Sequence, residues 1–262
     1  MGVIAYQNRE NDVALDFIKK ALVIKPDYAE AYINRGTDLE RLGQLEEAMQ
    51  SYDKAIQLEP DNAEAYSNRA AVQLGLGQLD KAVESYDKAI QLKPNFVDAY
   101  SNLLLTLNYT PDLDLSDHIA TARKFGELVT EKAKPQLSDY QCLPRPEKLR
   151  VGLVSGDLRS HPVSYFLESV LSSMAPSKIE LIAYPTTPAV DDLTERIKPS
   201  FSIWKPIYGK NDEAAANMIY ADGVHILLDL SGHTADNRLP MFGYKPSPVP
   251  VSYTHLTLPT KA

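Results

Sequence analysis

Two short segments of the sequence combine a carboxylate, an imidazole and small residues. The segment SGDLRSHP at 155–162 contains Asp157 and His161, and the segment DLSGHT at 229–234 contains His233. An imidazole changes its protonation state near neutral pH, so it can exchange a proton with a bound reactant. From residue types alone, we predict that the two segments line a binding pocket.

The elements that must position these segments are strands. After Lys148, apolar runs of strand length alternate with helical stretches near 163–174, 191–198 and 212–221. The predicted strands are Leu149–Ser155, Ile179–Pro185, Ser202–Ile207 and Val224–Leu230. This alternation predicts a parallel sheet covered on both faces, which places ligands beyond the carboxyl ends of its strands. The two segments follow the first and fourth predicted strands, so we expect them to face one crevice.

The first hundred residues have a different organisation, a repeat of 34 residues. Pro26, Pro60 and Pro94 lie 34 residues apart. The same register relates Ala14, Ala48 and Ala82, then Ala21, Ala55 and Ala89, then Tyr32, Tyr66 and Tyr100, and finally Gly43 and Gly77. This pattern is the tetratricopeptide signature and predicts two helices per unit, near 30–42 and 46–58 in the clearest copy.

A repeated asparagine offers a candidate binding surface. Asn34, Asn68 and Asn102 occupy the sixth place of each first helix. Such a stack would line the concave face of a solenoid, where side-chain amides can pair with a peptide backbone of any sequence. The alternative is that asparagine is only a tolerated polar residue at this place, and the repeats leave both interpretations open.

Domain boundaries follow from the changes in pattern. We expect repeats over residues 1–104, a helical linker over 105–147 and the α/β region over 148–250. The chain starts within the first helix of a repeat, so we expect the first copy to be truncated. The linker contains a helix near 116–132 and then a connector with three prolines.

Composition argues against several classes of function. The chain has 27 basic and 35 acidic residues and a net charge of −8, without the clustered cations that bind nucleic acid. Its single cysteine, Cys142, excludes an internal disulfide and suits a reducing compartment. We find neither an apolar run of membrane-spanning length nor a signal-peptide pattern, so we expect a cytoplasmic protein without a membrane or nucleic-acid partner.

Three stretches resemble the protein O-GlcNAc transferases, especially bacterial members of the Spindly-like branch. LRVGLVSGDLRSHPVSYFLESVL and DGVHILLDLSGHTADNRLPMFGYKPSPV resemble the N-terminal lobe of the catalytic domain, and NLLLTLNYTPDLD resembles its junction with the repeats. With the repeats, the resemblance covers residues 1–250. It implies an α-α solenoid followed by a Rossmann-like lobe, the first half of a two-lobe (GT-B) glycosyltransferase.

The resemblance also implies an activity. The family transfers N-acetylglucosamine from UDP-GlcNAc to Ser or Thr hydroxyls of proteins with inversion. The repeats would bind acceptor peptides, and no cofactor or metal ion is expected. A protein O-fucosyltransferase that uses GDP-fucose is one alternative, and a non-catalytic repeat adaptor is another.

Residue roles follow from the matched motifs. His161 of the His-Pro motif lies beside the donor sugar and acceptor hydroxyl in the family and has been considered a general base. Pro162 of the same motif is expected to contact the substrate. Asp157 matches a carboxylate that has been proposed to help move the proton. The alternative to a catalytic role is that His161 is a loop residue held by Pro162, and that Asp157 caps the following helix.

A second set of matched residues lies in the loop that approaches the donor, namely Gly232, His233, Thr234 and Arg238. Arg238 would assist a leaving diphosphate or, as the favoured alternative, pair with Asp236. Val163 and Ala235 stand where the animal enzymes have Thr and Lys, and these differences leave the identity of the donor sugar nucleotide open. His225, inside a predicted strand, is expected to be a core histidine with its hydrogen bonds satisfied.

The last residues depart from the resemblance. After Val249 the chain reads Pro250 and then VSYTHLTLPTKA, which matches the translation of a transposase-based sequencing adapter. We therefore expect residues 251–262 to be non-native and His255 to have no function. We also expect the nucleotide-binding second lobe to be missing, so that the chain alone neither binds nor hydrolyses UDP-GlcNAc.

Overall fold

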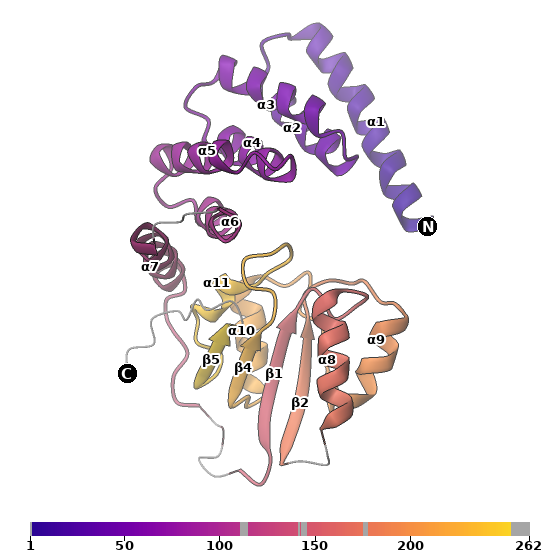
Figure 1. Ribbon diagram of the computed structural model, residues 1–262, viewed down its shortest axis with the longest axis vertical. Coiled ribbons are helices and arrows are strands. Elements are labelled where there is room, and N and C mark those ends of the chain that lie inside the picture. The colour runs from indigo at the N-terminus through magenta and orange to yellow at the C-terminus, as the bar shows by residue number, and fades with distance from the viewer. Residues whose placement is uncertain (1, 111–114, 141, 143–145, 175–177, 253–262) are drawn as a thin grey trace. The chain divides into compact units, whose positions relative to one another are not determined.

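The protein is described by a computed structural model over residues 2–110, 115–140, 142, 146–174 and 178–252 (Figure 1). The chain divides into two compact units, Met1–Thr121 and Ala122–Ala262. The first unit holds the helical repeats and the second holds a parallel sheet with helices on both faces. The predicted change from repeats to strand–helix alternation is confirmed.

The repeats form the predicted helix pairs. The helices are α2 (Ala29–Arg41), α3 (Leu45–Leu58), α4 (Ala63–Gly75), α5 (Leu79–Leu92) and α6 (Val97–Leu107). In α3, Ala48, Tyr52 and Ala55 are fully buried, because small side chains let the facing helices approach while the aromatic ring fills the space between them. Gly43 and Gly77 turn the chain between helices with φ of 75° and 72°, a backbone conformation that favours glycine.

The first repeat differs from the predicted helix pair. Helix α1 runs without interruption from Gly2 to Ile24. The position that is Gly43 and Gly77 in the later copies is Arg9 in the first copy. A residue with a Cβ atom disfavours the left-handed turn, so the two expected helices continue as one.

Helix α7 (Leu115–Lys132) crosses the boundary between the two units, and its second half packs within the α/β unit. A Cβ atom on Gly243 would lie 2.7 Å from Cγ1 of Val129, which shows how closely this half of α7 approaches the segment between β4 and β5. The connector that follows donates Leu137 N–H to Tyr244 O at 2.9 Å. The second half of α7 and the residues around Leu137 therefore pack as part of the α/β unit.

The sheet contains five parallel strands in the order β3-β2-β1-β4-β5. The strands are β1 (Leu149–Ser155), β2 (Ile179–Pro185), β3 (Ile203–Trp204), β4 (Ile226–Asp229) and β5 (Val249–Ser252). The bounds of β1 and β2 match the prediction, whereas β3 and β4 are shorter. Strand β5 was not predicted; it pairs with β4 and takes in the first two residues of the expected non-native tail. The remainder of that tail, 253–262, lies outside the described residues.

Helices cover both faces of the sheet. Helices α8 (Pro162–Ser173) and α9 (Asp192–Ile197), with a 3₁₀ turn at Lys198–Ser200, pack on one face, while α10 (Asp212–Ala221) and α11 (Leu239–Phe242) pack on the other (Figure 1). Neighbouring residues of β1 show the alternation, since Leu153 joins the core under α8 and α9 and Val154 joins the core under α10 and α11. The predicted doubly covered sheet is confirmed.

Candidate functional site

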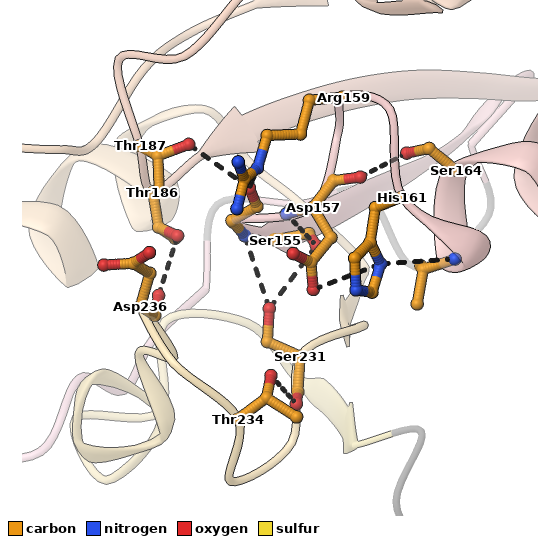
Figure 2. Close-up of polar contacts among 12 residues, drawn as sticks. Ser155, Asp157, Arg159, His161, Ser164, Thr186, Thr187, Ser231, Thr234 and Asp236 are labelled. Carbon is orange, nitrogen blue, oxygen red and sulfur yellow. Dashed lines mark hydrogen bonds and ion pairs between the residues drawn. The ribbon is translucent and has the colours of Figure 1, made fainter. Parts of the chain in front are cut away.

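The loops that follow β1 and β4 meet at one edge of the sheet. The two strands are parallel neighbours, with Val154 opposite Asp229, so both chains leave the sheet at the same end. There the Gly156 N–H donates to Ser231 Oγ at 3.3 Å (Figure 2). The prediction that the segments at 155–162 and 229–234 share one crevice edge is confirmed.

Asp157 and His161 face each other on the first of these loops. The distance from His161 Nδ1 to Asp157 Oδ2 is 3.7 Å (Figure 2). The imidazole is 39% exposed, whereas the carboxylate is 11% exposed. The ring is therefore open to a reactant, and the carboxylate lies on its Nδ1 side within electrostatic reach.

His161 also caps the helix that follows it. Its Nδ1 accepts a hydrogen bond from Val163 N–H at 3.3 Å, and Pro162 occupies the first turn of α8. The sequence alternative in which Asp157 caps this helix is therefore wrong. The cap lies directly before the proline, whose fixed φ suits the start of a helix, and Asp157 is too far upstream to occupy it.

The loop between Asp157 and His161 is held by the start of α9. Thr194 Oγ1 donates to Leu158 O at 2.8 Å, and Asp191 Oδ2 accepts from Ser160 N–H at 2.6 Å. Asp191 is also the N-cap of α9 and forms a capping box with Thr194. The Ser160 N–H makes the largest contribution to holding the pKa of Asp191 below its ordinary value. Sequence analysis missed both residues, although the Asp-x-x-Thr spacing at a helix start was visible.

The second loop is organised by Asp229 at the end of β4. Its carboxylate is buried, with the residue 1% exposed, and accepts from Ser231 N–H at 3.1 Å, Gly232 N–H at 2.8 Å and Ser252 Oγ at 2.8 Å. Burial raises the pKa of Asp229, and these three hydrogen bonds oppose the shift. Gly232 has a φ of 57°, and Thr234 Oγ1 donates to Ser231 O at 2.7 Å, which closes the turn.

A third loop reaches the same edge and packs closely against Gly156. A Cβ atom at this position would lie 3.0 Å from Asp236 Cβ, 3.0 Å from Thr186 Oγ1 and 3.3 Å from Thr187 Cγ2. Thr187 Oγ1 donates to Gly156 O at 3.2 Å, and Thr186 Oγ1 donates to Asp236 O at 2.7 Å. The loop after β2 thus links the loops after β1 and β4, and neither threonine was singled out from sequence.

His233 is buried rather than open to the crevice. Its ring meets that of Phe125 of α7 edge-on, with centroids 5.0 Å apart. This histidine is only 3% exposed. The structure thus gives the ring a packing role, and the donor contact of His233, like those of Pro162, Gly232 and Thr234, stays a prediction.

Arg238 does not pair with Asp236, so that expectation is wrong. Its Nη2 lies 2.8 Å from Asp212 Oδ1, and it donates to the carbonyls of Ile207 and Lys210 at 3.2 and 3.0 Å. Asp236 adopts a left-handed backbone with a φ of 59° in the preceding turn, whereas the Arg238 side chain reaches the first turn of α10. A diphosphate would have to compete with these partners, and that role stays a prediction.

His225 lies just before β4 rather than within it. Its Nδ1 accepts from Arg150 N–H at 3.1 Å, and the residue is half-buried. The expected hydrogen-bonded histidine is confirmed, but it lies at the start of the strand and not in the core. Neutral imidazole nitrogens accept in this way, so this residue ties β1 to β4.

The repeated asparagines keep equivalent places in α2, α4 and α6. Asn34 is exposed, and Asn68 and Asn102 are half-buried. All three residues are therefore at least partly exposed at the same position of each first helix, while peptide binding by them stays a prediction. Across the part of the chain that the structure describes, no group of three or more His, Cys, Asp or Glu residues is placed to hold a metal ion, and no helix is long and apolar enough to cross a bilayer.

Comparisons with known proteins agree with this arrangement. A mutant of the Thermobaculum terrenum O-GlcNAc transferase has a similar structure, with a TM-score of 0.79 and 28% identity over 96% of this chain and 49% of its own. The probable UDP-N-acetylglucosamine–peptide N-acetylglucosaminyltransferase SPINDLY is 31% identical over 155 residues in Arabidopsis thaliana and 33% identical over 158 residues in Oryza sativa. Each SPINDLY match covers 57% of this chain and 17% of the relative, so the chain spans about a sixth of their length.

Different family models match the repeats and the α/β region. Tetratricopeptide repeat families match residues 41–77 and 63–96. The model of glycosyl transferase family 41 matches residues 111–261, which include α7, the whole sheet and both loops of the crevice. Because this match covers more than half of the chain, the protein belongs to glycosyl transferase family 41.

Proposed function

We propose that this chain supplies the repeats and the proton-handling lobe of a protein O-GlcNAc transferase, which moves N-acetylglucosamine from UDP-GlcNAc to Ser or Thr hydroxyls. Membership of family 41 and the names of the SPINDLY relatives support the reaction class. The observation that carries the proposal is the position of His161, half-exposed at the crevice edge with its Nδ1 3.7 Å from Asp157 Oδ2.

The reaction needs a group that takes up a proton. The acceptor hydroxyl oxygen forms a bond to the anomeric carbon, the bond from that carbon to the diphosphate breaks, and UDP leaves with the electron pair. The hydroxyl proton goes to Nδ1 of His161, the ring nitrogen that carries no proton, and the Asp157 carboxylate stabilises the imidazolium by charge. The turn at Gly232–Thr234 approaches the donor from the neighbouring strand.

The repeats have a separate role in this proposal. Asn34, Asn68 and Asn102 bind the backbone of the acceptor segment through their side-chain amides. Tetratricopeptide repeats suggest interaction with proteins, which supports this assignment. The single cysteine supports a cytoplasmic location as part of the proposal.

A two-lobe chimera tests the function. Residues 1–250 would be followed by the corresponding remainder of the Thermobaculum terrenum enzyme, and transfer to a Ser/Thr peptide would be measured by mass spectrometry with UDP-GlcNAc and with GDP-fucose. We expect GlcNAc transfer by the chimera and none by the 262-residue chain alone. Fucose transfer would change the donor assignment. Peptide binding without transfer from either donor would contradict the enzyme and favour an adaptor.

A further inference from the structure

A buried chain of hydrogen bonds joins the two crevice loops. Ser155 Oγ and Ser231 Oγ lie 3.4 Å apart, and Gly156 N–H donates to Ser231 Oγ at 3.3 Å. Asp157 N–H donates to Ser155 Oγ at 3.0 Å. Ser155 is 0% exposed and Ser231 is 4% exposed, so water does not substitute for these partners.

The chain continues to Asp229. That carboxylate accepts the N–H groups of Ser231 and Gly232, and so fixes where the Ser231 hydroxyl lies. An aliphatic side chain at the end of β4 would fill the same space but would leave two consecutive buried N–H groups without an acceptor. The role of Asp229 in holding the Ser231–Gly232 turn thus explains why a carboxylate stands at this buried position.

We propose that Asp229 and Ser231 are positioning residues for Asp157. They hold the turn at Ser155–Asp157 so that the Asp157 carboxylate faces His161, and they do not touch the reacting atoms. This inference rests on the proposed function. Figure 2 shows the contacts among Ser231, Ser155 and the turn that carries Asp157.

The two serines act on different backbone groups, which makes the proposal specific. A serine hydroxyl has one donor hydrogen and two acceptor lone pairs. Ser231 Oγ accepts from the Gly156 amide, whereas Ser155 Oγ accepts from the Asp157 amide. Removing either hydroxyl should therefore release one particular amide and leave the strand interior unchanged.

Ser247 provides a matched control. It is 1% exposed, and among the described residues its Oγ has no hydrogen-bond partner. Ser247→Ala removes the same atom from the same unit, but it leaves no donor or acceptor unpaired. Any effect that comes only from deleting a buried hydroxyl should occur in this variant too.

Amide hydrogen exchange in the 262-residue chain tests the positioning directly. We expect Ser231→Ala to accelerate exchange of the Gly156 amide about tenfold, and Ser155→Ala to do the same for the Asp157 amide, because each loses its acceptor. The Leu153 amide should be unchanged in both variants, and Ser247→Ala should match the wild type. Unchanged exchange at Gly156 and Asp157 would overturn the proposal. If Ser231→Ala fails to fold, Asp229→Asn is measured in its place, because it removes one of the oxygens that hold the Ser231–Gly232 turn. An unchanged Gly156 amide in that variant would also overturn the proposal.

Steady-state kinetics in the two-lobe chimera test the consequence for catalysis. Ser231→Ala and Asp229→Asn should lower kcat at least tenfold, with KM for donor and peptide within about twofold, since a displaced catalytic group affects the transition state more than binding. Loosened amides with an unchanged kcat would refute the positioning role. An inactive wild-type chimera would instead count against the proposed function, and hydrogen exchange would still decide whether the chain holds the turn.

Discussion

The Nδ1 atom of His161 accepts a hydrogen bond from Val163 N–H at 3.3 Å, and the same atom lies 3.7 Å from Asp157 Oδ2. While Nδ1 accepts this bond, the neutral ring carries its proton on Nε2. A ring that takes up a proton at Nδ1 loses the helix cap and gains a charge facing the carboxylate. One imidazole nitrogen therefore serves both the fold of α8 and the proposed chemistry.

Two substitutions separate these roles. His161→Asn keeps a side-chain oxygen that can cap α8 but cannot act as a base near neutral pH, whereas His161→Ala loses both functions. We expect both variants of the two-lobe chimera to lose 10²-fold or more in kcat, roughly the contribution of general base catalysis. Only His161→Ala should also lose about 1 kcal/mol of stability in urea unfolding. Full activity of His161→Asn would show that the histidine is only a cap.

Asp191 should stabilise the site loop in a pH-dependent way. Its folded pKa is lowered, mainly by Ser160 N–H, so its charge stabilises the fold above the ordinary aspartate value of 3.8. This contribution is lost as the pH falls through the lowered folded value. We expect Asp191→Ala to cost about 1 kcal/mol at pH 7 and Asp191→Asn less, because asparagine also caps helices.

Urea unfolding of both Asp191 variants between pH 7 and pH 3 measures this effect. The difference between wild type and Asp191→Asn should shrink as the pH approaches the lowered folded value. A difference that grows towards acid pH would contradict the assigned sign.

Arg238 should stabilise the fold through α10 rather than through the turn at Asp236. Asp212→Asn removes the charge 2.8 Å from the guanidinium and also an acidic group in the first turn of α10. We expect a loss of about 1 kcal/mol for this variant and less than about 0.5 kcal/mol for the matched Asp236→Asn. Thermal unfolding compares the two, and a larger loss in Asp236→Asn would restore the pairing expected from sequence.

Tyr52 and Tyr86 occupy the same place in successive repeats but differ in their hydrogen bonds. The Tyr52 hydroxyl lies 3.2 Å from both Glu40 Oε2 and Thr37 Oγ1. In the next repeat, the places of Thr37 and Glu40 are taken by Ala71 and Leu74, whose side chains cannot hydrogen-bond the Tyr86 hydroxyl. Tyr52→Phe should cost about 1 kcal/mol because it leaves a partly buried carboxylate without its donor, and Tyr86→Phe should cost less. Equal unfolding midpoints for the two variants would argue against this account.

Periodic features of the fold could be predicted from sequence, and particular partners could not. The 34-residue register gave the bounds of α2 and α3 to within one residue, and apolar runs gave β1 and β2. Strand β5 was missed because half of it lies in the tail that was expected to be non-native, and because a four-residue strand that contains a proline has too few alternations to show a period.

In the candidate site, too, the overall placement of residues could be predicted but their individual partners could not. The order of strands and loops placed Asp157 and the 229–234 segment at one edge, because parallel neighbours end together. The helix cap by His161, the Asp212 partner of Arg238 and the contact between Gly156 and Ser231 depend on backbone directions within loops. Those directions are set by tertiary packing, which no local pattern records.

The contacts of the two units also differ in how far they reach along the chain. In the repeats, Arg69 bonds Asp53 only 16 residues away, whereas Gly156 and Ser231 at the crevice are 75 residues apart. Short loops close quickly and long ones slowly, so the repeats should fold first and the crevice should assemble last, once β4 reaches β1. Pulse-labelled refolding should then protect amides of α3 and α5 before that of Gly156. The part of the chain proposed to do chemistry would spend the longest time unformed, and a nascent polypeptide would expose the edge of β1 until β4 had been synthesised.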